Sequence, residues 1–138
     1  MRIEIPAHLI PKLRAMQADW RNNVAKDVGL EDAVLLVIDL FTHTFMTFDG
    51  RFLLYDSLED GPPLETSDPK EAYGAILLGA KRWHAPWLLE LLPARPGDAP
   101  DCGVCKGKGF ISPLKDTQGK PIEFVCHGCG GLGWIPPG

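Results

Sequence analysis

The chain has 138 residues, a formal net charge of −4 and a hydrophobic content of 45%, which suffice for one small domain with a modest core and an appended module. No run of 18 or more apolar residues occurs, and no basic segment followed by an apolar stretch opens the chain, so we expect neither a membrane-spanning helix nor a secretory signal peptide. Residues 1–100 carry 10 basic and 15 acidic side chains (net −5), and residues 101–138 carry four and three (net +1), so neither part is basic enough to predict binding to a phosphate backbone.

The first predicted element is an amphipathic helix over residues 7–26. Its apolar residues recur every three or four positions and form one stripe; they are Leu9, Leu13, Met16, Trp20 and Val24. Pro11 suits a first helical turn, so we expect the regular helix to begin near Ile10 and to end at Gly29. The stripe, including Trp20, is predicted to belong to the core.

Residues 33–41 are nearly all apolar. Periodicity does not separate a buried strand from a buried helix when every phase is apolar, but the β-branched residues in this run favour a strand. Asp49-Gly50 then stands between the strand-like runs 45–48 and 51–55, a pattern that predicts a β-hairpin.

A second helix is predicted to begin after Asp68. Asp68 is a suitable N-cap, Pro69 suits the first helical position, and Glu71 stands where a capping box requires an acidic residue. Pro86 predicts the start of a further short helix.

The C-terminal part of the chain contains an internal repeat. Residues 102–113 and 126–137 agree at six of 12 positions: two cysteines, two glycines, an isoleucine and a proline. These repeats hold all four cysteines of the chain in two C-x-x-C pairs, which are Cys102, Cys105, Cys126 and Cys129. Two such pairs have the spacing of a four-thiolate zinc site.

Zinc prefers four tetrahedral ligands, and closed four-cysteine sites are usually structural. We therefore predict one structural zinc ion per chain, bound in two cysteine knuckles. The knuckles need residues that tolerate positive φ or close backbone approach, and the candidates are Gly107, Gly109, Gly131 and Gly133. Residues 110–114 and 122–125 are predicted to form a hairpin around a turn at residues 116–119. With so few large apolar side chains in this segment, metal binding should supply part of its folding free energy.

Two other interpretations of the cysteines are a disulfide framework and a redox-active dithiol. Disulfides suit secreted chains, and nothing in the sequence indicates secretion. A thioredoxin-like dithiol is expected near a βαβ pattern, whereas these are two similar copies followed by glycines. His127 lies within the second pair and could bind metal, but with four thiolates present we expect it to be an exposed knuckle residue.

These elements predict an α+β protein. A small domain of helices and a β-hairpin should span residues 1–92, followed by a linker over residues 93–100, where three prolines favour an extended chain. The C-terminal β-hairpin zinc module, with its two knuckles, should span residues 101–138.

The repeated C-x-x-C-x-G-x-G pattern resembles the cysteine-rich zinc domain of DnaJ-type (Hsp40) co-chaperones. The resemblance covers residues 102–135, about a quarter of the chain, and implies that Cys102, Cys105, Cys126 and Cys129 bind one zinc ion. The co-chaperone domain has four repeats and two zinc ions, whereas this chain has two repeats. It also lacks the His-Pro-Asp motif of the J domain, so stimulation of an Hsp70 is not implied. The resemblance implies a rigid platform that holds a peptide or a protein partner.

The first functional hypothesis is therefore a non-enzymatic zinc protein that acts as a protein-protein interaction or chaperone-like binding module. Its predicted contact residues are Phe110 and Trp134, and the segment around Trp83 and Trp87 is a further candidate surface. Catalysis stays open, although no P-loop, G-x-G-x-x-G or G-x-S-x-G motif occurs. Reduced cysteines that bind metal suit the cytoplasm.

Two alternatives belong to other classes. The zinc hairpin could bind single-stranded nucleic acid through Lys106, Lys108, Phe110 and Trp134, although the net acidity of the chain argues against nucleic acid as a partner. Residues 33–92 also resemble, without a specific motif, small bacterial immunity proteins of the SMI1/KNR4 type.

Overall fold

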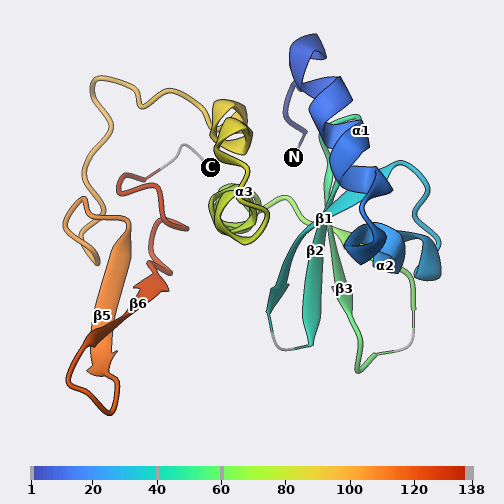
Figure 1. Cartoon of the computed structure of the whole chain (residues 1–138). Coiled ribbons are helices and arrows are strands. Elements are labelled where there is room, and N and C mark those ends of the chain that lie inside the picture. Colours follow the sequence, from blue (N-terminus) through green and yellow to red (C-terminus); the bar gives the residue numbers. More distant parts are fainter. Residues whose placement is uncertain (1, 40, 60, 136–138) are drawn as a thin grey trace. The chain divides into compact units, whose positions relative to one another are not determined.

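The computed structural model describes residues 2–39, 41–59 and 61–135, and its helices and antiparallel sheets confirm the α+β class (Figure 1). The chain divides into two compact units. The first comprises Met1–Ser67 and Ala75–Leu92, and the second comprises Asp68–Gly74 and Pro93–Gly138. The domain limits expected at residues 92 and 100 remain a prediction.

A four-stranded antiparallel sheet in the order β1-β2-β3-β4 organises the first unit. Its strands are β1 (Ala33–Asp39), β2 (Thr42–Thr47), β3 (Phe52–Asp56) and β4 (Leu64–Glu65). The apolar run at residues 33–41 is thus mainly a strand, as its β-branched residues indicated. The predicted hairpin is formed by β2 and β3, and within its Asp49-Gly50 turn Gly50 takes a positive φ of 86°.

The register of the sheet places apolar side chains on both of its faces. Leu35 pairs with Phe45, and Phe45 pairs with Leu53, so these three side chains share one face. They pack with Ala25 and with the partly buried Trp83. Val34, Met46 and Phe52, which are also buried, alternate with them on the other face; the sheet is therefore enclosed on both sides.

The helix expected over residues 7–26 is wrong as a continuous element. The segment consists of η1 (Ala7–Leu9), α1 (Ile10–Ala18), η2 (Trp20–Asn22) and α2 (Asn23–Asp27). The break lies at Asp19, whose backbone is extended (φ −66°, ψ 135°) and whose carboxylate accepts from the N–H of Arg21 at 2.9 Å. Asp19 caps the next helical turn, and the change of direction leaves Trp20 78% exposed instead of in the core.

Asn22 explains why the chain turns at this point. Its side chain is buried, donates to the carbonyl of Met16 at 2.9 Å and accepts from the backbone N–H of Leu35 on β1. A buried polar side chain is stable only when such bonds are made. Asn22 thus ties the helical segment to a backbone amide of the edge strand β1, which the apolar periodicity did not reveal.

Helix α3 (Pro69–Arg82) begins where the sequence predicted, and the carboxylate of Asp68 accepts from the N–H of Lys70 at 3.0 Å. The predicted further helix is η3 (Pro86–Leu91), a 3₁₀ segment. Gly79 lies against Leu36, where an added Cβ would come within 3.2 Å of that side chain. None of the helices in the described ranges combines the length and apolar character needed to cross a membrane.

The second unit contains the hairpin of β5 (Phe110–Lys115) and β6 (Pro121–Val125), each ending within a residue of its predicted limit (Figure 1). Asp116 closes the turn by accepting from the N–H groups of Gln118 and Lys120 at 2.9 and 2.8 Å. A C-x-x-C knuckle flanks the hairpin on each side: one leads into β5 and the other follows β6.

Candidate metal centre

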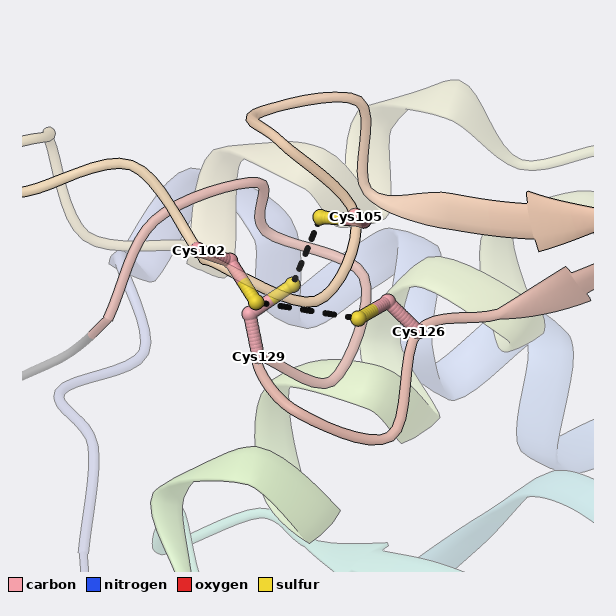
Figure 2. Close-up of side chains that lie close together, drawn as sticks. All are labelled: Cys102, Cys105, Cys126 and Cys129. Atoms are coloured by element: carbon pink, nitrogen blue, oxygen red, sulfur yellow. Dashed lines mark hydrogen bonds between the residues drawn. The ribbon is translucent and has the colours of Figure 1, made fainter.

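The structure brings the four predicted cysteines together from two separate loops (Figure 2). Cys102, Cys105, Cys126 and Cys129 are all buried, and their Sγ atoms lie within 4.8 Å of one another. The Sγ–Sγ distance is 3.7 Å for Cys102 and Cys126 and also 3.7 Å for Cys105 and Cys129. A tetrahedron with metal–sulfur bonds of about 2.3 Å has edges of about 3.8 Å, so the donor set fits a tetrahedral metal ion.

Two reciprocal backbone hydrogen bonds hold the loops together. The N–H of Cys102 donates to the carbonyl of Gly133 at 3.0 Å, and the N–H of Cys126 donates to the carbonyl of Gly109 at 3.1 Å. Each repeat therefore binds the other through equivalent atoms. The sequence repeat corresponds to a local two-fold arrangement of the backbone around the sulfur atoms.

Backbone amides also point at the sulfur atoms. The N–H of Gly109 donates to Sγ of Cys105 at 3.2 Å, and the N–H of Gly133 donates to Sγ of Cys129 at the same distance. A hydrogen-bond donor stabilises the negative charge of a thiolate, which is the form that binds metal. These two donors therefore favour the thiolate form of Cys105 and Cys129, in opposition to burial.

The predicted knuckle glycines take the backbone conformations that such loops require. The φ angles are positive at Gly107, Gly109, Gly131 and Gly133. At Gly109 and Gly133 a larger residue would also collide with the other repeat. An added Cβ on Gly109 would lie 2.5 Å from the carbonyl oxygen of Gly131, and one on Gly133 would lie 2.6 Å from that of Gly107. The glycines of each repeat therefore permit the close approach of the other repeat.

One of the positions at which the two knuckles differ has a structural consequence. Lys106 and Gly130 both have positive φ (55° and 69°). Each donates its N–H to the backbone carbonyl of the first cysteine of its own pair at 2.8 Å. An added Cβ on Gly130 would lie 2.4 Å from the carbonyl oxygen of Lys70, which belongs to the first turn of α3 within the same unit. Only a glycine fits there, whereas the first knuckle accommodates a lysine.

Burial and neighbouring groups shift the thiol pKa values in opposite directions. At Cys105 burial opposes ionisation, but the N–H of Gly109 and the adjacent thiols outweigh it and lower the pKa to about 7. At Cys129 burial dominates and raises the pKa to about 12. The four thiols would not all ionise near neutral pH by themselves, so a bound cation would have to supply the remaining stabilisation.

The other predicted site residues lie in different environments. His127 is exposed in the second knuckle. Phe110 is 41% exposed on β5. Trp134 is only 6% exposed and forms an isolated antiparallel β-bridge with Asp101, so it offers little surface to a partner. Trp83 is partly buried, with the guanidinium of Arg21 at 4.6 Å from its ring centre.

The apolar pattern and the N-cap predict a helix that begins near Lys70, but nothing in the local sequence indicates that the carbonyl of Lys70 lies against the second knuckle. The glycine at position 130 is the one trace of this contact in the sequence, since the equivalent position of the first repeat is a lysine.

No protein family matches this chain, and the searches of curated proteins and of solved structures also found no match. Among the described residues, the four cysteines form a buried cluster with the geometry of a metal site.

Proposed function

We propose that this is a zinc-binding protein in which a structural zinc ion holds a C-terminal hairpin module that binds a partner protein. The observation that carries the proposal is the buried cluster of four sulfur atoms, approached by backbone amides and closed by the reciprocal bonds between the repeats. Four thiolates suit zinc and fill its tetrahedral coordination, which leaves no position for a reacting water molecule.

The exposed hairpin supports a binding role over a catalytic one. Nearly every residue of β5 and β6 is exposed, including the apolar Leu114 and Phe124. A two-stranded hairpin is marginally stable alone, and exposed apolar side chains on such an element are typical of interaction sites. The likeness of the repeats to the DnaJ zinc domain agrees with a platform for peptide or protein, and a thiolate-bound zinc suits the reducing cytoplasm.

The zinc part of the proposal is tested by native mass spectrometry. We expect one zinc ion per wild-type chain and its loss from Cys102→Ser, with His127→Ala as a matched knuckle control that keeps the metal. An absence of metal, or a metal content unaffected by Cys102→Ser, would overturn the proposed site. The interpretation of the C-x-x-C pairs as redox-active dithiols would then be favoured.

The binding part is tested by co-precipitation of partners from cells that express the tagged protein. Phe124→Ser should lose specific partners while keeping zinc. Leu58→Ser, which changes a side chain that is 69% exposed in the first unit, should retain them. Equal capture by both variants would place the binding surface elsewhere.

A further inference from the structure

One face of the hairpin is a continuous row of apolar side chains. Ile111 pairs with Phe124 and Leu114 pairs with Ile122, and cross-strand partners share a face. Phe124 and Ile122 are two positions apart, so all four side chains lie on the same side. Ile111 packs against the cysteine cluster, whereas Leu114 (58%), Phe124 (43%) and Ile122 (36%) are exposed. The metal centre thus supports one end of an uncovered apolar face.

The two edges of the hairpin differ in their capacity to pair with another strand. Strand β5 carries Pro113, which has no N–H, and its register shifts between Ile111 and Leu114. Proline and irregular register are features that block pairing at a sheet edge. Strand β6 has a proline only at its first position and is regular thereafter.

The hydrogen bonds show which groups of β6 face outward. The N–H of Cys126 donates to Gly109, and the carbonyl of Lys120 accepts from Asp116. In an antiparallel ladder the direction alternates, so the backbone groups of Glu123 and Val125 point away from β5. No hydrogen bond outside the β5–β6 ladder uses these two amides among the described residues. The outer edge of β6 is therefore free for a further strand.

The free charges at the two ends of the hairpin are positive. Lysines stand in the first knuckle and beside the turn, and none of them forms an ion pair with another described residue; they are Lys106, Lys108, Lys115 and Lys120. No nearby carboxylate forms an ion pair with these lysines among the described residues. Asp101 is bound to Arg95 at 2.6 Å, Asp116 closes the turn, and Glu123 lies on the face opposite Phe124.

We propose that the β6 edge binds an extended segment of a partner protein by strand addition, with alternating apolar residues on the face of Phe124 and acidic residues at the segment's ends. This inference rests on the proposed function and adds the class of partner. Main-chain pairing supplies affinity in such complexes, and alternate side chains supply specificity. A protein segment fits better than single-stranded nucleic acid because the face is largely aliphatic and Trp134 is buried.

The test measures fluorescence anisotropy of a labelled peptide, Asp-Glu-Val-Thr-Ile-Thr-Val-Glu-Asp, with the full-length zinc-loaded protein. Glu123→Pro removes an outward N–H without touching the β5–β6 ladder, and Glu123→Ala is its matched control. We expect binding to wild type and to Glu123→Ala, and a loss of about tenfold in Glu123→Pro. Equal affinity of the two variants would overturn strand addition.

A second variant guards against a folding defect in Glu123→Pro. Phe124→Ser changes an exposed side chain and should weaken the peptide by about tenfold while zinc content stays at one per chain. A peptide with lysine in place of its acidic residues should bind about fivefold more weakly than the acidic probe at low salt. Equal or tighter binding of the lysine peptide would contradict the charge argument.

The outcomes separate this inference from the proposed function. If zinc is absent, the proposed function fails first. If zinc is present and partners co-precipitate but the peptide does not bind, the strand-addition inference fails alone. Binding of oligo(dT) in preference to the peptide would also overturn it and favour nucleic acid.

Discussion

In the first unit, the largest side chains with under 2% of their surface exposed are apolar, among them Phe45, Phe52 and Ile76. In the second unit they are the cysteines Cys102, Cys126 and Cys129. The first unit therefore gains its stability from apolar surface removed from water. The second unit encloses sulfur atoms and leaves most of its large apolar side chains on the outside. We expect it to depend on the metal, because a segment with so small a core cannot offset the entropy of ordering its chain.

The largest expected effect separates the two units directly. Cys102→Ser, or removal of the metal by a chelator, should unfold the β5–β6 module, since structural zinc in small domains contributes on the order of 10 kcal/mol. The sheet of the first unit should persist. Two-dimensional amide NMR spectra would show collapse of the signals from residues 101–135 with retention of those from β1–β3. Simultaneous loss of both sets would mean that the units fold as one.

The converse change is Phe45→Ala in the first unit. Its ring is fully buried between Leu35 and Leu53, so truncation should lower the free energy of unfolding by about 3–5 kcal/mol. Zinc should remain bound, as measured by metal content after purification. Leu58→Ala, at an exposed position, is the control and should change stability by less than about 0.5 kcal/mol.

A smaller effect should distinguish the two knuckles. In Gly130→Ala the new Cβ would meet the carbonyl of Lys70 at 2.4 Å, and positive φ adds strain, so we expect a loss of about 2 kcal/mol. Lys106→Ala alters the equivalent position, which already carries a Cβ, and should be nearly neutral. Metal retention during urea titration would compare the variants, and equal behaviour would show that the contact with Lys70 contributes little.

The pH dependence of zinc binding is a further test. Zinc binding displaces protons from the thiols, so its apparent affinity should fall as the pH falls. Each displaced proton accounts for about tenfold per pH unit. Because the pKa of Cys105 is about 7 without metal, this thiol competes for protons only near and below pH 7, and the decline should become steeper there. Competition with a coloured chelator between pH 8 and 6 would measure it, and a flat profile would contradict thiolate ligation.

The helical segment before β1 shows where sequence periodicity failed. Periodicity predicts the burial of the stripe from Leu9 to Met16 correctly, because those side chains are buried. Trp20 continues the same spacing but is exposed, since Asp19 interrupts the helix and the side chain of Asn22 is buried instead of that of Trp20. Periodicity reports which residues can share a face, but it cannot detect a polar side chain that bonds to a distant strand.

The candidate site was more predictable than this segment. The spacing of the cysteines and glycines is local, and a knuckle is formed by a few consecutive residues whose conformations the sequence restricts. The α+β class, the hairpins and the start of α3 at Pro69 followed for the same reason, from turn residues, caps and strand-forming runs.

The sequence by itself thus determined the four clustered cysteines and the strands that join them, because these depend on residue type and short-range spacing. Only the tertiary structure decided that each repeat closes on the other's glycines, that Gly130 must admit the carbonyl of Lys70, and that β6 has the open edge. Those features arise between segments far apart in the chain. Backbone approach and strand register there depend on packing, which no local pattern encodes.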